Sequence, residues 1–199
     1  MTGVALHYQR NADRLARAYL DVAFEDVHSA LLSYLPAPGS AVADIGAGAG
    51  RDARALAARG YEVTAVEPSS AMRRLGEKVS APYAVDWLAD ELPDLAGLRR
   101  RPLRFDFVLC SAVLMHLAPA LLDRAFAGMA AVCARGAVIA TTLRPPRPDD
   151  PPGVFHDHAE ADVVAAARRS GLTLLGRGCN ADRLNRQGTA WTWLVFKAG

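Results

Sequence analysis

A glycine-rich segment carries the strongest chemical signal in this sequence. Asp44, Gly46, Gly48 and Gly50 alternate with small residues at the end of a short apolar run. Glycines in such a place let the backbone approach a ligand closely, and the end of a strand is where an open parallel sheet binds its ligand. A dinucleotide-binding loop would need a third glycine where Arg51 stands, and a phosphate-binding loop would need a lysine followed by serine or threonine. The segment therefore predicts a ligand site of another kind.

The elements that must position this segment follow from an alternation of short apolar runs and helical patterns. Strands are expected at 41–45, 62–66, 83–88, 105–110, 137–142, 172–177 and 189–197, and helices at 51–59, 69–79, 119–134 and 158–170. Helical spacing over 5–35 predicts one or two further helices before the first strand.

The order of these elements predicts the fold class. Alternating strands and helices favour parallel strands with right-handed crossovers. The loop between the last two strands is too short for a helix, so those strands should be antiparallel neighbours. We expect an α/β fold with a seven-stranded doubly wound Rossmann-like sheet, mostly parallel with a C-terminal antiparallel strand, and helices on both faces.

Composition narrows the class of protein. The chain has 199 residues, of which 51% are hydrophobic and 22% charged, so disorder is excluded. We expect a single domain over 1–199, with an N-terminal helical cap at 1–38 and a Rossmann-like core at 39–199. The net charge of +2 is too small to argue for a nucleic-acid partner.

The compartment is predicted from two patterns that we do not find in the sequence, a membrane span and a signal peptide. The longest apolar runs are about half of the roughly 18 to 20 residues that a membrane span requires, so we expect no membrane segment. Residues 1–10 show no signal-peptide pattern. We therefore expect a cytoplasmic protein in which Cys110, Cys133 and Cys179 are free thiols.

The pattern DxGxGxG resembles motif I of the class I S-adenosylmethionine-dependent methyltransferases, especially bacterial members that act on small molecules. The resemblance extends from Val42 to Phe196 in order and spacing. It implies S-adenosylmethionine as cofactor and S-adenosylhomocysteine as product. The residues that it places at the methionyl and ribose parts of the cofactor are Asp44, Gly46, Ala47, Gly48 and Gly50.

Further cofactor contacts follow from the same resemblance. Glu67 matches the acid that accepts hydrogen bonds from both ribose hydroxyls, which its two oxygens allow. Pro68 and Met72 match residues that flank the adenine. Asp86 and Asp90 compete for the adenine amine, and Asp90, followed by Glu91, is more similar to the family's loop.

The remaining candidates come from two other segments. Phe105–Ser111 resembles motif IV and places Ser111 at the cofactor. On the N-terminal helix, Tyr8 and Arg14 are predicted to reach the methionine carboxylate. His116 is a candidate general base, because the pKa of an unperturbed histidine suits that task, although packing against the next helix explains it as well.

Three other features have two interpretations each. The proline-rich run 144–153 is either a lid over the acceptor or a solvated connector. Trp191 and Trp193 share one face of a strand, which suits helix packing or an acceptor platform. The adjacent residues 156–158 include two histidines but cannot all face one ion, so we predict no metal site.

The resemblance implies methyl transfer to an oxygen, nitrogen or carbon of a small-molecule acceptor. The alternatives are methylation of RNA or protein, or a non-catalytic module that binds S-adenosylmethionine. Cys110–Val113 stands where adenine-specific methyltransferases carry two prolines and an aromatic residue, which argues against a flipped adenine as substrate.

Overall fold

The computed structural model describes residues 3–184 and 189–199. Its strands are β1 Ala41–Ile45, β2 Glu62–Val66, β3 Val85–Leu88, β4 Phe105–Ser111, β5 Cys133–Leu143, β6 Leu172–Ala181 and β7 Ala190–Ala198. Its α-helices are α1 Gly3–Leu20, α2 Phe24–His28, α3 Arg51–Ala58, α4 Ser70–Ser80, α5 Ala96–Arg99, α6 Leu122–Ala130 and α7 Glu160–Arg169. Short 3-10 turns, η1 Ser29–Tyr34, η2 Leu114–His116 and η3 Pro119–Leu121, lie between them.

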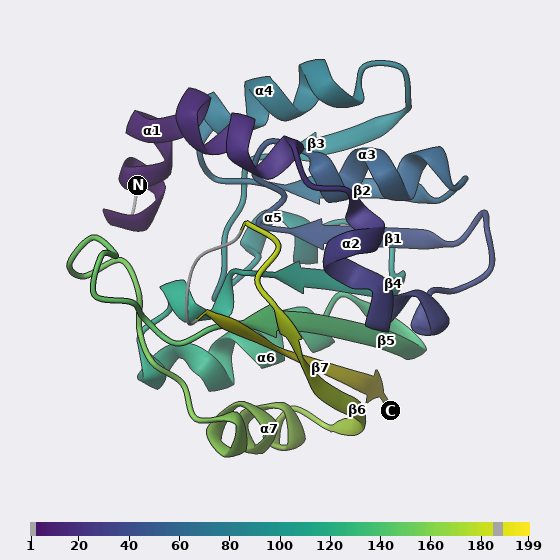
Figure 1. Cartoon of the computed structure of the whole chain (residues 1–199). Helices are drawn as coiled ribbons and strands as arrows, with labels where there is room; N and C mark the ends of the chain where they lie inside the picture. The colour runs from purple at the N-terminus through teal and green to yellow at the C-terminus, as the bar shows by residue number, and fades with distance from the viewer. Residues whose placement is uncertain (1–2, 185–188) are drawn as a thin grey trace.

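The seven strands form one sheet in the order β3-β2-β1-β4-β5-β7-β6. β7 is antiparallel to both of its neighbours, and every other pair is parallel (Figure 1). The predicted sheet and its antiparallel C-terminal pair are thus confirmed. Because the chain crosses from one side of β1 to the other between β3 and β4, the sheet has its switch point beside the glycine-rich segment.

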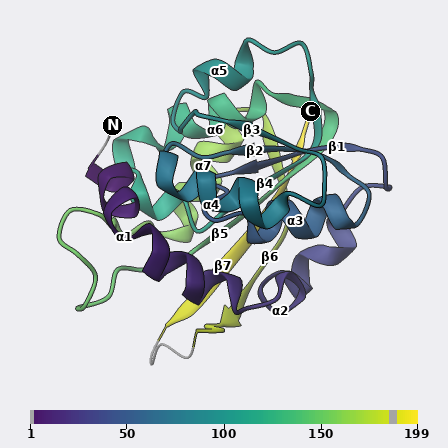
Figure 2. The same cartoon turned by 90° about the horizontal axis from the view of Figure 1, so that it is seen from above.

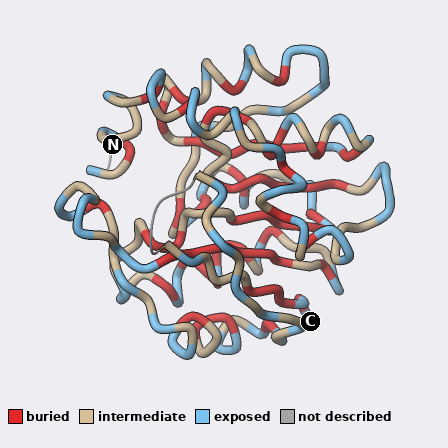
Figure 3. The backbone as a smooth tube through the Cα atoms, viewed as in Figure 1, coloured by how far each residue is buried: buried red, intermediate tan, exposed pale blue. Residues whose placement is uncertain are grey.

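Helices cover both faces of the sheet, as Figure 2 shows from above. On one face α5, α6 and α7 pack on the strands around Phe126 and Phe196. On the other face α2, η1 and α3 pack around Phe24, Leu56 and Phe107. The buried residues run along the central strands in Figure 3, which places the core against the sheet.

Several expected elements differ in their bounds, among them the strand expected at 172–177, which extends to Ala181 as β6. The helix expected at 119–134 consists of the turn η3 followed by α6, and it ends at Ala130. β5 begins at Cys133 rather than at 137, because Cys133 already pairs with Phe105 of β4. The alanine-rich stretch has a helical composition, but the pairing of Cys133 with Phe105 ends the helix early.

Helix α1 lies beside α4, at the end of the sheet toward which the arrowheads of β1 and β4 point (Figure 1). The small residues Ala12 and Ala16 pack against the buried Met72 of α4. Gln9 of α1 fastens the two helices, because its Oε1 accepts from the Ser69 hydroxyl at 2.9 Å and from the Ala71 amide at 2.9 Å. One side chain of α1 therefore satisfies donors at the start of α4.

Candidate functional site

A cavity of 330 Å³ opens at the carboxyl ends of β1, β2, β4 and β5. Its floor is the glycine-rich segment and Glu67, and its opposite wall includes Arg144, Phe155 and Trp191. Val4, Ala5 and Tyr8 of α1 cover it. The cavity therefore lies where an open α/β sheet binds its ligands.

The glycine-rich loop turns sharply under the cavity. Gly46 has a φ of 74° and Gly48 a φ of 54°, which glycine adopts without strain. The amides of Gly46 and Ala47 both donate to the carbonyl of Val66, at 2.8 and 3.0 Å. A Cβ on Gly46 would lie 2.3 Å from Val113 Cγ2, whereas one on Gly48 would meet nothing within 4 Å. The loop therefore leaves open space above Gly48.

Glu67 joins the loops that follow β1 and β2. Its Oε2 accepts from the Gly48 amide at 2.9 Å, and its Oε1 accepts from the Ser69 amide at 2.8 Å. Burial raises the pKa of this carboxyl, and the two amides partly oppose that rise. Each oxygen keeps a second lone pair, so the carboxylate can accept two more hydrogen bonds from a ligand.

Beneath the loop lies a buried group of charges. Asp52 accepts two hydrogen bonds from Arg51, at 2.6 and 2.8 Å, and one contact from His28 at 3.1 Å. Burial opposes ionisation of Asp52, but Arg51 and His28 outweigh it and hold its pKa below the usual range. Asp44 is buried as well, and burial and Asp52 raise its pKa. Its Oδ2 has no hydrogen-bond partner among the described residues.

The two acids that compete for the adenine position lie in different places. Asp90 lines the cavity, and its oxygens accept from the amides of Glu91 and Leu98 at 3.0 and 2.8 Å. Asp86 is exposed and forms an ion pair with Arg101. The geometry thus favours Asp90 over Asp86 as a group that a ligand in the cavity can reach.

The end of β4 contributes a strained turn. Ala112 has a φ of 59°, in the left-handed region that residues with a Cβ rarely adopt. Its amide donates to the carbonyl of Thr142 at 2.9 Å and also meets the Thr142 hydroxyl at 3.0 Å. Ser111 Oγ lies 2.9 Å from the same hydroxyl. Thr142 of β5 therefore holds the backbone of this turn at the cavity.

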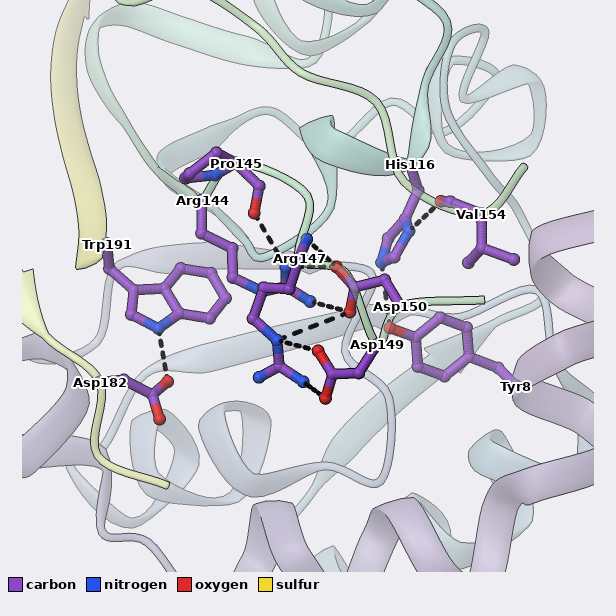
Figure 4. Close-up of polar contacts among 10 residues, drawn as sticks. All are labelled: Tyr8, His116, Arg144, Pro145, Arg147, Asp149, Asp150, Val154, Asp182 and Trp191. Carbon is purple, nitrogen blue, oxygen red and sulfur yellow. Dashed lines mark hydrogen bonds and ion pairs between the residues drawn. The ribbon is translucent and has the colours of Figure 1, made fainter. Parts of the chain in front are cut away.

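His116 is half-buried and lies beside Tyr8 (Figure 4). Tyr8 Oη lies 3.0 Å from His116 Nε2, and His116 Nδ1 lies 2.8 Å from the carbonyl oxygen of Val154. Phe155 packs against the imidazole with ring centroids 4.6 Å apart. Burial lowers the pKa of His116 to about 4, so the ring is neutral at physiological pH.

Arg144 holds the proline-rich segment against the cavity. Its guanidinium makes two hydrogen bonds to Asp150, at 2.7 and 2.8 Å (Figure 4). It also lies 4.5 Å from the centroid of the Phe155 ring. The Arg147 amide adds a bond to Asp150 at 2.7 Å. Burial opposes ionisation of Asp150, yet these donors outweigh it and lower its pKa. The segment is thus an ion-paired turn whose first residue, Arg144, lines the cavity, while most of the residues that follow are exposed to solvent.

The structure brings most of the predicted site residues to the cavity. Those that line it are Tyr8, Gly46, Ala47, Gly48, Glu67, Pro68, Asp90, Glu91, Ser111 and His116. Trp191 and Trp193 line it too, and the Trp191 indole donates to Asp182 at 2.8 Å.

Four predicted residues do not line the cavity. Asp44 is buried beneath the loop, and Met72 is fully buried in the α1–α4 contact. Arg14 is exposed and bonds Asn11 of its own helix. Gly50 serves close packing, because a Cβ there would lie 2.9 Å from the Gly76 Cα of α4.

Arg144 and Phe155 are wall residues that sequence reasoning did not single out. Arg144 directly follows β5, so the rule that parallel strands end at one edge would have indicated it. Phe155 carries no such signal, because it follows an irregular segment whose path depends on the Arg144–Asp150 pair.

Comparison with known proteins identifies a methyltransferase domain in the chain. The family model described as a methyltransferase domain matches residues 42–136, from β1 to the start of β5. No curated protein sequence is similar enough to the chain to give a match.

Solved structures of similar fold span nearly the whole chain. Burkholderia thailandensis 1,6-didemethyltoxoflavin-N1-methyltransferase, with 1,6-didemethyltoxoflavin and S-adenosylhomocysteine bound, has a TM-score of 0.78 and 16% identity over 98% of this chain and 86% of that one. A TehB-like S-adenosylmethionine-dependent methyltransferase from Corynebacterium glutamicum has a TM-score of 0.72 and 16% identity over 98% of this chain and 99% of that one. Synechocystis magnesium protoporphyrin IX methyltransferase, with S-adenosylmethionine bound, has a TM-score of 0.65 and 18% identity over 100% of this chain and 86% of that one.

The fold is therefore that of the class I methyltransferases, and residues 42–136 form a methyltransferase domain. Over residues 42–136 the chain matches the methyltransferase domain, and over its whole length it shares the fold of solved S-adenosylmethionine-dependent methyltransferases. None of the helices in the described part of the chain is long and apolar enough to cross a membrane.

Proposed function

We propose that this methyltransferase moves a methyl group from S-adenosylmethionine to a small molecule held in the cavity between the glycine-rich loop and Phe155. The observation that carries this proposal is that one cavity of 330 Å³ extends from Glu67 to Arg144 and Trp191 under the cover of α1. A cofactor at the loop would leave the acceptor the space toward His116 and Phe155, which suits a small ligand better than a polymer.

The residues at the loop fit the cofactor. Glu67 would accept hydrogen bonds from the ribose hydroxyls with its remaining lone pairs, and Asp90 would accept from the adenine amine. The open space above Gly48 allows a ligand to approach the backbone. Asp44 lies beneath the loop with its Oδ2 unpartnered among the described residues, and the family resemblance places this acid at the amino-acid end of such a ligand.

Bound S-adenosylmethionine supplies a methyl group on a positively charged sulfur, which is already activated for transfer. The protein must then align the acceptor with the methyl group and exclude water. Thr142 holds the backbone of Ser111 and Ala112 at the edge of the cavity, and Phe155 and the tryptophans form its apolar wall. The free cysteines Cys110, Cys133 and Cys179 fit a reducing compartment, and we propose the cytoplasm.

One structural neighbour shows why turnover must be measured. The [4+2]-cyclase SpnF shares the fold with a TM-score of 0.77 and 12% identity over 98% of this chain, yet its name gives another reaction. The fold alone is thus compatible with a protein that uses the cavity differently.

The test has two steps. Calorimetric titration with S-adenosylmethionine, S-adenosylhomocysteine and NAD should show binding of the first two alone. Purified protein with methyl-tritiated S-adenosylmethionine is then offered the ultrafiltered small-molecule fraction of a bacterial lysate, bulk RNA or bulk protein. Label in the small-molecule fraction supports the proposal. Label in RNA or protein, or tight binding with no transfer at all, favours the corresponding alternative.

A further inference from the structure

Tyr8, His116 and Val154 form a row of hydrogen bonds at the acceptor end of the cavity (Figure 4). The three residues come from α1, η2 and the segment before α7, so the row exists only when these parts are closed on one another. Both Tyr8 and His116 line the cavity. The row therefore faces the place where an acceptor would lie.

The chemistry of the three groups fixes the direction of both hydrogen bonds. A carbonyl oxygen only accepts, so His116 Nδ1 must carry a proton and donate to Val154. Because the ring is neutral, Nε2 then carries a lone pair and no proton. Tyr8 must donate its hydroxyl proton to Nε2. Its oxygen keeps two lone pairs, and Tyr19, whose side chain also hydrogen-bonds Tyr8, lies beside that oxygen.

The surroundings keep the His116 ring neutral. Phe155 covers one face of the imidazole. The titratable groups that act on the pair are Tyr19, Glu67, Arg144, His7 and Asp150. Arg144 is itself paired with Asp150, so the cation nearest the row is largely compensated.

We propose that the Tyr8 hydroxyl, with His116 behind it, is the group that removes the proton from the methyl acceptor. This inference rests on the proposed methyl transfer, and it names the acceptor class: a molecule whose reacting atom carries a proton, such as a phenolic hydroxyl. Tyr8 is then the catalytic residue, and His116 is a positioning residue that stores the proton.

The step balances in protons and in charge. The acceptor atom forms its bond to the methyl carbon as the bond from that carbon to sulfur breaks, with the electron pair going to sulfur. The acceptor proton moves to Tyr8 Oη, and the Tyr8 proton moves to His116 Nε2. One positive charge disappears from sulfur and one appears on the imidazolium, so the total charge of the closed cavity stays constant.

The resting hydrogen bonds can be tested without knowing the acceptor. Long-range ¹⁵N–¹H correlation spectra of the full chain with S-adenosylhomocysteine should show His116 protonated on Nδ1 alone. His158 is a matched internal control, because its Nε2 lies 3.0 Å from the carbonyl of Leu114 and should carry the proton instead. In Tyr8→Phe the His116 Nε2 resonance should move toward that of a nitrogen without a donor. A proton on His116 Nε2 would overturn the proposal.

A second measurement tests whether the pair faces the reacting charge. If the imidazolium forms as the sulfonium charge is lost, the titration midpoint of His116 should be higher with S-adenosylhomocysteine than with S-adenosylmethionine, by about one pH unit. The midpoint of His158 serves as the reference in the same spectra. A purely structural histidine remote from the sulfur would give equal midpoints, and that result would contradict the proposal.

The two proposals fail in different ways. If neither sulfur nucleoside binds in calorimetry, the proposed function fails. If both bind and His116 has the wrong tautomer or equal midpoints, only the proton relay fails.

Discussion

The two sides of the cavity are built in different ways. On the cofactor side, Gly46, Gly48 and Glu67 lie on adjacent loops and are joined by backbone amides. On the acceptor side, Tyr8 meets His116 across 108 positions of sequence, and Arg144 meets Asp150 through buried side-chain charges. The cofactor side therefore follows from the ends of two adjacent strands, whereas the acceptor side forms only when three segments of the chain pack together.

The strongest test of this division is Tyr8→Phe. Loss of the hydroxyl should slow methyl transfer to a hydroxyl acceptor by about 1,000-fold, within the range typical of general-base catalysis. The affinity for S-adenosylhomocysteine should stay nearly constant, because Glu67 and the loop are untouched. Initial rates and calorimetry measure the two quantities. A parallel loss of cofactor affinity would show that Tyr8 belongs to the cofactor side.

Asp150→Ala should have the next largest effect. It leaves the buried Arg144 guanidinium without its carboxylate, which costs about 3–5 kcal/mol of unfolding free energy when a buried pair is broken. Denaturant unfolding measures this cost. The exposed pair Arg169–Asp123 offers a matched control, since Asp123→Ala should cost below about 1 kcal/mol.

Glu67→Ala probes the other side. Loss of the carboxylate should weaken binding of S-adenosylhomocysteine by about 100-fold, the effect of losing two hydrogen bonds to a charged group. Calorimetry gives the affinity, and circular dichroism should show a retained fold. Unchanged affinity would remove Glu67 from the cofactor site and break the comparison.

The pH dependence of stability should distinguish the two sides of the cavity. As pH falls, His116 and Glu67 should change the unfolding free energy in opposite directions. His116 has a pKa lowered to about 4, so below pH 6.5 the unfolded chain binds a proton that the folded chain does not. Its contribution should reduce the unfolding free energy by about 2 kcal/mol at pH 5. His116→Gln should abolish this loss. Glu67, whose pKa burial raises, acts in the opposite direction, because the folded state takes up its proton first as pH falls.

The smallest expected effect is a difference in stability between two glycine variants on the cofactor side. Gly46→Ala and Gly48→Ala both place a Cβ at positive φ, at a cost of about 1–2 kcal/mol. Only Gly46→Ala also collides with Val113, so it should be the less stable variant in thermal unfolding. Adding Val113→Ala should restore part of that loss. Equal stability of the two single variants would show that the loop relaxes away from Val113.

The sequence predicts the cofactor side better than the acceptor side for a physical reason. Strand ends and glycine positions follow from local patterns, so the sheet, the turn at Gly46 and the place of Glu67 could be predicted. The contact of Tyr8 with His116 could not, because it depends on how α1 folds over the sheet. For the adenine position the resemblance already favours Asp90 over Asp86, and packing adds the physical reason, since Asp86 pairs with Arg101 at the surface.

The contact of Gln9 with α4 bears on the order of events during turnover. It lies next to Tyr8 on α1, and its amide oxygen holds the start of α4. Any opening of α1 wide enough to admit a ligand must break these bonds and withdraw Tyr8 from His116. If ligands enter and leave past α1, ligand exchange and removal of the acceptor proton cannot coincide. Each turnover would then alternate between an open protein that exchanges its ligands and a closed protein that is competent to react.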